Sequence, residues 1–276
     1  YLTSMIGYVF IFFILLLEGI YFTAYNLQNA YPLFGTTLSA VTFIFLILVP
    51  VLTMKTIAEE RKQKTDQLLL TAPVSVSEIV LGKFLAVATV YAIPVLIICL
   101  YPMIMGKYGT VSYAMAYTAV LGFALLGFAQ IAVGVFWSSV TENPVIAAVV
   151  TFIALFVCYM ITGIGSLIPD SSMASLACYM LLVLLAAVWI YHMIRNLWIA
   201  AVIGIAGEAA LAITYVVKST LFEGSIQKFL SVFDITSHFD NFTNGILDLQ
   251  GVVYFLSVII IFLVLTVQTI TKRRWN

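Results

Sequence analysis

The sequence predicts an all-α polytopic membrane protein with about eight transmembrane helices. Of its 276 residues, 63% are hydrophobic and only 9% are charged, whereas a typical soluble domain is about 25% charged. The apolar residues also fall in runs of roughly 17 to 25, the length of a helix that crosses a bilayer. These runs lack the two-residue alternation of a membrane β-strand. We expect one domain over residues 1–276, and a native N-terminus upstream of Tyr1 because the chain does not begin with Met.

The candidate spans cover residues 5–25, 34–54, 79–105, 114–138, 144–167, 176–192, 197–217 and 252–270. Ser75 and Glu78 form an S-x-x-E capping box that starts the third span, and Pro144 suits the first turn of the fifth. Pro50 lies inside an apolar run and predicts a kink. The sixth span is the shortest, and without it every later segment would change sides.

The positive-inside rule supports eight spans with both termini in the cytoplasm. On that count nine basic residues lie inside and three outside. Those inside are Lys55, Arg61, Lys62, Lys64, Lys83, Arg195, Lys272, Arg273 and Arg274, and those outside are Lys107, Lys218 and Lys228. With seven spans, the C-terminal basic cluster would lie outside, which the rule disfavours.

A charged island, TIAEERKQKTDQLLLTAP, lies between the second and third spans. Six charges fall within eight positions, namely Glu59, Glu60, Arg61, Lys62, Lys64 and Asp66. The residue types favour a helix, and Glu60 precedes Lys64 by four positions, the favourable order for an ion pair. We expect a helix over about 55–72 on the cytoplasmic membrane surface, with its charges outward to dock a soluble partner. The alternative is a solvated loop that fixes orientation.

An outer segment, residues 221–250, has the three- and four-residue spacing of amphipathic helices. Its apolar residues include Phe229, Phe233, Phe239 and Phe242. We expect one or two helices on the outer surface, or dipping partway into the membrane. Two interpretations stand side by side: a cap over the bundle, or a gate over a pathway with these phenylalanines as gate candidates.

Three polar residues inside apolar spans are pathway candidates. Glu18 and Glu208 are carboxylates placed where a charge is costly, and each could face a water-filled path, bind a cationic group or stay protonated. The alternatives for these two acids are a hydrogen bond to a neighbouring helix and, for Glu18, a place near the outer interface. Gln130 is a weaker candidate in the fourth span. A row of small residues lies along one face of the same span, namely Ala124, Gly127, Gly134 and Ser138. It predicts close helix packing, with a gate as the alternative.

Several kinds of chemistry are absent from the sequence. No GxxxxGK[ST], HExxH or GxSxG motif occurs. The two histidines, His192 and His238, are predicted on opposite sides of the membrane, so they do not form a metal site. The formal net charge is zero, which gives no reason to expect a nucleic-acid partner. We therefore expect no catalytic residue, no metal site and no cofactor in this chain.

The run PVLTMKTIAEERKQKTDQLLLTAPVSVSEIVLGKF resembles the signature of ABC-2 type transporter permeases. The positions that fit are Pro50, Thr53, Met54, Ala58, Glu59, Glu60, Arg61, Thr65, Leu68, Leu69, Pro73, Gly82 and Lys83. SHFDNFTNGILDLQGVVYFLS, followed by TKRRW, resembles the end of the gliding-motility-associated subfamily. Three features depart from the pattern: Lys64 replaces the usual Gly, Gln67 replaces an acid, and 167–218 adds two spans to the usual six.

The resemblance implies the membrane subunit of an ABC exporter in a bacterial cytoplasmic membrane. A full transporter would hold two permeases, the same or homologous, and two ATPase subunits that carry ATP and Mg. An extracytoplasmic accessory protein is a further possible partner. The island would be the coupling helix that docks the ATPase through Ile57, Glu59, Glu60, Arg61, Lys62, Lys64, Asp66 and Leu68. The outer segment would form re-entrant helices beside the exit.

Two other function classes stay open. An ion-coupled secondary transporter would use Glu18 and Glu208 as proton sites and would not need the island. A non-transporting scaffold would pass the work of an ATPase to an extracytoplasmic partner.

Overall fold

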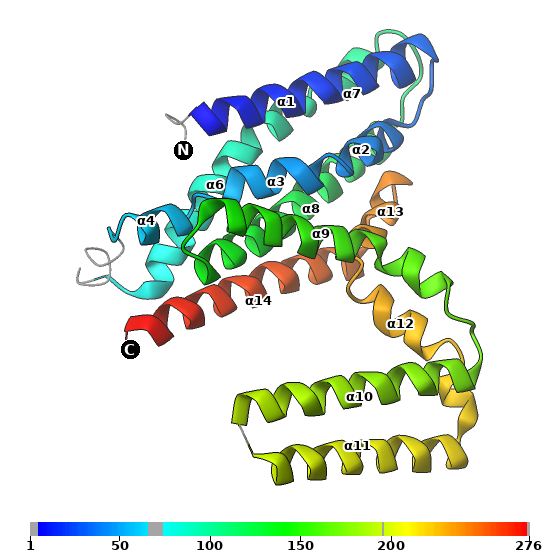
Figure 1. Ribbon diagram of the computed structural model, residues 1–276. Coiled ribbons are helices and arrows are strands. Elements are labelled where there is room, and N and C mark those ends of the chain that lie inside the picture. The colour runs from blue at the N-terminus through cyan, green and yellow to red at the C-terminus, as the bar shows by residue number, and fades with distance from the viewer. Residues whose placement is uncertain (1–4, 66–73, 195, 275–276) are drawn as a thin grey trace. The chain divides into compact units, whose positions relative to one another are not determined.

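The computed structural model describes residues 5–65, 74–194 and 196–274. All regular structure among them is helical, with no strand, which confirms the predicted fold class. The chain divides into two compact units (Figure 1). Unit 1 comprises residues 1–157 and 235–276, and unit 2 comprises residues 158–234.

Unit 1 holds most of the helices. They are α1 (Met5–Tyr21), η1 (Phe22–Gln28), α2 (Phe34–Thr42), α3 (Phe45–Thr53), α4 (Ala58–Lys62), α6 (Val76–Ile98), α7 (Tyr101–Met105), α8 (Tyr113–Val140), α13 (Ser237–Thr243) and α14 (Leu249–Arg274). Helix α9 (Pro144–Ser166) begins in unit 1 and ends in unit 2.

Helix α8 forms the centre of unit 1 and packs against α14, α6, α3, α2 and α13. Small residues allow this close approach. A Cβ added to Gly127 would lie 2.2 Å from the ring of Tyr91, and one added to Gly134 would lie 2.2 Å from Oγ1 of Thr53. The packing role predicted for this row of small residues is therefore confirmed at these two positions.

Local sequence signals explain two of the helix starts. The capping box at α6 is present: Ser75 Oγ accepts from the Glu78 amide at 3.3 Å, and Glu78 Oε2 accepts from the Ser75 amide at 3.0 Å. Helix α9 begins at Pro144, where the missing amide of proline costs no hydrogen bond. Both starts agree with the prediction.

The second span bends at a place that the sequence analysis did not predict. Helices α2 and α3 meet at 59°, and the break lies at Phe43–Ile44 rather than at Pro50. The amides of Ile44, Leu46 and Ile47 bond three residues back, at 2.9 to 3.2 Å. Such tightened turns turn the helix axis locally, whereas Pro50 lies inside α3 without ending it.

Five helices in the described part of the chain are long and apolar enough to cross a membrane, and seven are if each bent helix pair counts as one span. The five cover Met5–Gln28, Val76–Met105, Tyr113–Val140, Pro144–Ser166 and Leu249–Arg273. The apolar stretch Ser172–Val188 is shorter. A helix occupies each predicted span, while crossing by all eight stays a prediction.

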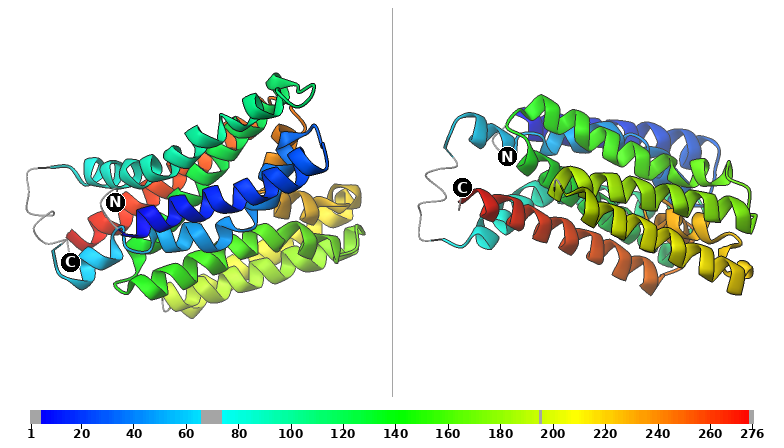
Figure 2. Two further views of the ribbon diagram at one scale, coloured as in Figure 1. Left: turned by 90° about the horizontal axis from the view of Figure 1, so that it is seen from above. Right: turned by 60° about the horizontal axis from the view of Figure 1, so that its bottom comes forward.

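Unit 2 is built around a helical hairpin of α10 (Ser172–Ile194) and α11 (Leu197–Val217). The two helices run side by side, as Figure 2 shows from two further directions. Small residues again set the spacing, since a Cβ on Gly207 would lie 2.8 Å from Val183 Cγ1. The short helices η2 (Ser219–Phe222) and α12 (Ser225–Ser231) follow α11. Most of residues 167–218, which are expected to add two spans to the usual six, therefore lies in this hairpin.

Candidate functional site

The first part of the charged island folds as α4, a helix of five residues. Its N-cap residue, Ile57, has no side chain that can accept a hydrogen bond, so the first amides of the helix need another partner. Ser138 of α8 supplies it. Its Oγ accepts from the Ile57 amide at 3.0 Å and from the Ala58 amide at 3.1 Å, and donates to the Met54 carbonyl at 3.2 Å. One hydroxyl from α8 thus fixes the start of α4.

Arg61 fixes the other side of α4 to the end of α8. Its guanidinium donates to the carbonyls of Ser139 and Thr141, the second at 3.1 Å, and to Glu142 Oε1 at 2.9 Å. The Arg61 side chain is only 5% exposed. The last carbonyls of a helix lack partners within the helix, and they favour a nearby cation. Arg61 therefore serves the C-terminus of α8 and does not point outward.

Helix α14 joins the same cluster. Arg273 Nη1 lies 3.6 Å from Glu142 Oε1, and Arg273 Nη2 donates to the Val140 carbonyl at 3.2 Å. Glu142 is therefore shared by two arginines from different helices. It is 71% exposed, so water screens these ion pairs. The carbonyl contacts carry the larger part of the anchoring.

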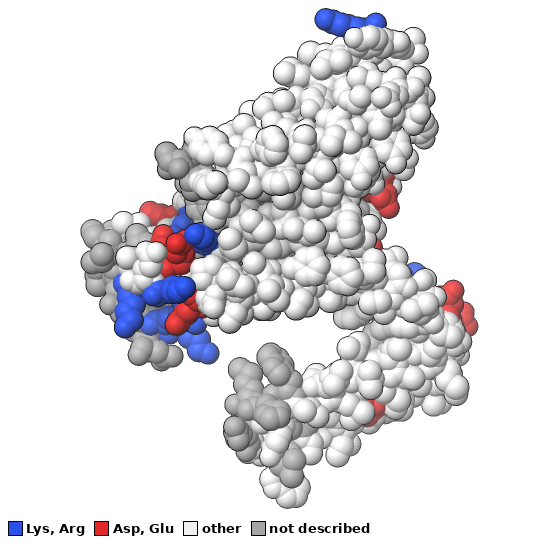
Figure 3. Space-filling model, turned by 45° about the horizontal axis from the view of Figure 1, so that its top comes forward, with Lys and Arg blue, Asp and Glu red and all other residues white. Residues whose placement is uncertain are grey.

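Two lysines pair with the acids of α4. Lys83 of α6 forms an ion pair with Glu60 and donates to the Thr56 carbonyl at 3.0 Å. Lys55 lies 3.4 Å from Glu59 Oε2, four residues along the chain. Figure 3 shows the charges of both signs gathered at this end of unit 1. We call the cluster formed by α4, Lys83, Ser138, Glu142 and Arg273 the charged end.

Helix α4 ends at Lys62, which corrects the expected helix over 55–72 within the described residues. The Lys64 amide bonds to the Arg61 carbonyl at 3.1 Å, and the Thr65 amide bonds to the Glu60 carbonyl at 2.9 Å. Lys64 itself has a φ of 58°. This is a Schellman motif, which stops a helix with a left-handed residue, usually Gly. Lys64 therefore occupies the position at the end of α4 where Gly is favoured, and this is the position where the resemblance in the sequence leads us to expect Gly.

The expected docking residues divide into an inward and an outward set. Ile57 and Arg61 are buried against α8, so the structure does not support them as contacts for a partner. Glu59 and Glu60 are partly exposed and engaged in ion pairs. Lys62 and Lys64 are the exposed members of the set among the described residues. Asp66 and Leu68 lie outside the described residues.

The residues that receive α4 could not be identified from the sequence. Ser138 belongs to the predicted row of small residues, and no pattern links Ser139, Glu142 or Arg273 to the island. Glu142 follows directly after the fourth span, and an acid there is the one signal that points to a basic partner. The carbonyls of Ser139 and Thr141 carry no signal in the sequence, because every residue has one.

Glu18 is fully buried in α1. Neither of its carboxyl oxygens has a hydrogen-bond partner among the described residues. Gln130, in α8, is 4% exposed, and its Oε1 has no partner either. A buried carboxyl group without a partner in an apolar helix is costly when ionised. Glu18 therefore stays a pathway candidate, and the structure offers no hydrogen bond in support of the alternative.

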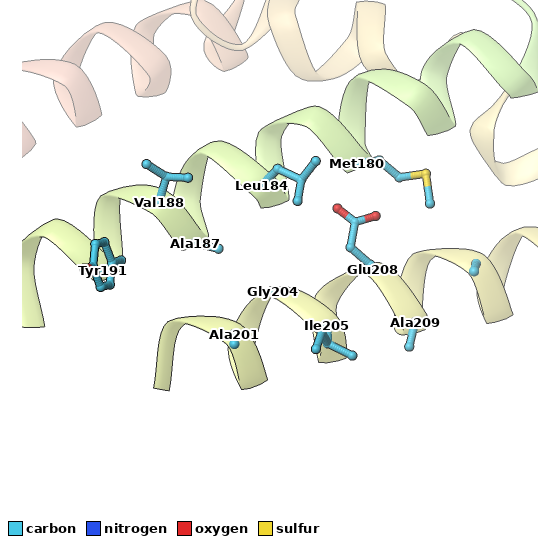
Figure 4. A pocket seen from close by; sticks show the side chains of 11 residues that line it. Met180, Leu184, Ala187, Val188, Tyr191, Ala201, Gly204, Ile205, Glu208 and Ala209 are labelled. Atoms are coloured by element: carbon cyan, nitrogen blue, oxygen red, sulfur yellow. The ribbon is translucent and has the colours of Figure 1, made fainter. Parts of the chain in front are cut away.

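Glu208 lies in unit 2, on a groove formed by α10 and α11. Its carboxylate points toward α10, between Leu184 and Met180 (Figure 4). Oε1 is shielded from solvent and has no hydrogen-bond partner in the described chain. The groove measures about 620 Å³, within the range of sites for small molecules.

The four outer phenylalanines occur in two different surroundings. In unit 2, Phe229 and Phe233 are partly exposed, with ring centroids 5.4 Å apart. In unit 1, Phe239 and Phe242 of α13 are buried and pack at 6.3 Å from Phe123 and 6.2 Å from Phe255, respectively. The last two are part of the core of unit 1. The gate role stays a prediction.

Asp248 caps the start of α14. Its carboxylate accepts from the Asn241 side chain and the Gln250 amide, both at 2.9 Å. The hydrogen bond from Asn241 comes first among the contacts that lower the pKa of Asp248 below its usual value. This contact joins the polar face of α13 to the last helix.

Comparison with known families gives one match. The model of a family described as ABC-2 family transporter protein matches residues 14–273, which is nearly the whole chain and includes α4, α8 and the hairpin of unit 2. No curated protein and no solved structure gives a match.

Proposed function

The chain belongs to the ABC-2 transporter family, and from this premise we propose that it exports a substrate by coupling to a separate ATPase at the charged end. The family match supports a multi-pass permease component of an ABC transporter, which is a membrane part and not itself an enzyme. ATP and Mg would then be held by the partner ATPase. The gliding-motility-associated subfamily stays part of the proposal and rests on the motifs near the C-terminus.

The observation that carries this proposal is the way α4 is held. A helix of five residues has no stability of its own in water, yet here Ser138 and Arg61 fix both of its sides to α8. Lys62 and Lys64 remain exposed to solvent. A small helix that is rigidly attached to the central helix of unit 1, with charges outward, suits the transmission of force from a soluble partner.

The charged end defines the side of the membrane in this proposal. Basic residues gather there, and the positive-inside rule places such a cluster in the cytoplasm. Arg273, close to the C-terminus of the described chain, lies in the same cluster through Glu142. We therefore place both termini in the cytoplasm of a bacterial cell, with the ATPase beneath α4. Two permeases and two ATPases complete the transporter.

Co-purification with the ATPase tests the proposal. The proposal predicts that an ATPase is encoded beside this gene and that the wild-type permease retains it in detergent. Lys62→Glu reverses an exposed charge on the outward face, and we expect retention to fall at least tenfold. Lys107→Glu is the matched control, because Lys107 is also exposed and is predicted on the opposite side of the membrane. Equal retention by both variants would remove α4 from the docking surface.

A second candidate function rests on Glu18. A fully buried carboxyl group without a partner also suits a proton site in an ion-coupled transporter. That function predicts substrate transport driven by a pH gradient in liposomes that contain no ATPase. The exporter predicts none under those conditions, and transport restored by the ATPase and ATP.

A further inference from the structure

The groove between α10 and α11 is lined almost entirely by carbon. From α10 it receives Met180, Leu184, Ala187, Val188 and Tyr191, and from α11 Ala201, Gly204, Ile205, Glu208, Ala209 and Ala212. The α11 residues run from Ala201 to Ala212, and these eleven steps of 1.5 Å give about 16 Å along the helix axis. Small residues on α11 keep this space open.

Glu208 is the one charged residue of this lining (Figure 4). It lies near the middle of α11, a helix without another acidic or basic residue between Leu197 and Val217. An ionised carboxylate in apolar surroundings is costly unless it is paired. Within unit 2, Oε1 of Glu208 has no hydrogen-bond partner among the described residues. The groove therefore offers a carboxyl oxygen without a hydrogen-bond partner, surrounded by apolar side chains, and a bound cation would stabilise the ionised form of this group.

The chemistry complementary to this arrangement is an apolar body that carries one positive charge. The apolar body would bury carbon surface against Leu184, Val188 and Ile205, which are all more than half exposed in this structure. The positive charge would supply the missing partner of Glu208. The ionised carboxylate would repel an anion, and a neutral molecule would not balance its charge.

We propose that the α10–α11 groove binds lipophilic organic cations at Glu208. The groove lies within unit 2 and is formed by the two helices of residues 167–218. Its volume, about 620 Å³, accommodates a molecule of several rings. Binding is a property of the permease itself, so the site does not depend on whether an ATPase docks at the charged end.

The test measures binding of tetraphenylphosphonium to the full chain in lipid nanodiscs with a cation-selective electrode. The wild type should bind it saturably, and Glu208→Gln should weaken binding at least tenfold. Glu208→Asp keeps the charge and should retain most of the affinity. Glu223→Gln is the matched control, because it removes an exposed acid of the same unit outside the groove, and it should bind as the wild type does.

Two further measurements separate charge from shape. Tetraphenylborate has nearly the same size with the opposite charge, and its association should not decrease in Glu208→Gln. Ala212→Leu fills the groove one turn from Glu208 and leaves the carboxylate in place, so tetraphenylphosphonium binding should weaken several-fold. If Ala212→Leu weakens tetraphenylphosphonium binding and Glu208→Gln does not, the assignment of a cation to this groove is overturned.

The proposal fails if the wild type shows no saturable binding, or if Glu208→Gln binds with unchanged affinity. It also fails if a second copy of the chain fills the groove. Ile205→Cys, introduced after the three natural cysteines are replaced, reports this outcome. Efficient disulfide formation between two copies in nanodiscs would mean that the groove is an interface. With Glu208 retained, tetraphenylphosphonium should instead protect the introduced thiol from a maleimide.

Discussion

Replacing Arg61 with alanine tests how α4 is attached to the rest of the permease. The guanidinium donates to two carbonyls at the end of α8 and to Glu142. A hydrogen bond that involves a charged group contributes about 1.5–3 kcal/mol. The contact with the Ser139 carbonyl is buried, and the contact with the Thr141 carbonyl is partly buried. The pair with Glu142, which is 71% exposed, contributes about 0–1 kcal/mol. We expect Arg61→Ala to lower the free energy of separating α4 from α8 by about 3 kcal/mol.

Hydrogen exchange measured by mass spectrometry on a peptide covering 54–65 reports this free energy directly. The amides of Ile57 and Ala58 bond to Ser138, so they exchange only when α4 leaves α8. A cost of about 3 kcal/mol corresponds to roughly a hundredfold faster exchange. A peptide from the centre of α8 serves as the control for global unfolding and should keep its protection.

Glu142→Gln provides the contrast. It removes only the screened ion pair, so exchange in the 54–65 peptide should rise by about fivefold at most. Arg61→Lys keeps the charge but lacks the planar fork that reaches several acceptors at once, and it should fall between the two. Exchange unchanged in Arg61→Ala, or a larger effect from Glu142→Gln than from Arg61→Ala, would refute the anchoring role.

Three further predictions concern stability. Lys64→Gly removes a left-handed non-glycine residue and should stabilise the end of α4 by about 1 kcal/mol, seen as slower exchange at positions 63–65. Gly134→Val drives a side chain into Thr53 and should lower the free energy of unfolding by about 3 kcal/mol or prevent folding. Gly82→Ala is the control, because the space around Gly82 is open, and it should be neutral or slightly stabilising. The melting temperature in detergent compares the two variants. Because the pKa of Asp248 is lowered in the folded state, its contribution is complete above its unfolded pKa and is lost as pH falls through the folded value. Asp248→Asn should therefore flatten the acid limb of the stability profile, and an unchanged limb contradicts the cap.

The class of fold follows from the sequence because lipid imposes a simple condition. Every backbone group inside the bilayer must find its partner within a helix or a closed barrel, so long apolar runs without alternation leave one choice. The seventh predicted span, 197–217, has the same bounds as α11. The capping box at Ser75 and the helix start at Pro144 were also predictable, because both depend only on neighbouring residues in the chain.

The charged end was less predictable because its contacts depend on tertiary structure. Helix propensity favours a long helix through the island, yet α4 ends in a left-handed residue at Lys64, where no Gly indicates the helix end. Arg61 reads as an exposed charge in a charged run, but its main partners are backbone carbonyls of α8. The bend between α2 and α3 was missed for a related reason, because tightened turns at 43–47 leave no residue signature comparable to Pro50.

For Glu18 and Glu208, too, the sequence indicates one property and the structure another. Their presence in apolar spans marks Glu18 and Glu208 as unusual from the sequence alone. Only the structure separates them: Glu18 is fully enclosed in unit 1, whereas Glu208 borders an open groove in unit 2. The sequence therefore identifies the candidates, and the surroundings decide what each can bind.

The central claim is that a separate ATPase docks on the outward face of α4. The most direct measurement places a photo-cross-linking amino acid at position 62 and illuminates membranes that contain the permease and its ATPase. The account predicts a covalent product of permease and ATPase from position 62, and none from position 107. A product from position 107 instead, or no product from position 62 while the ATPase still co-purifies, contradicts the account.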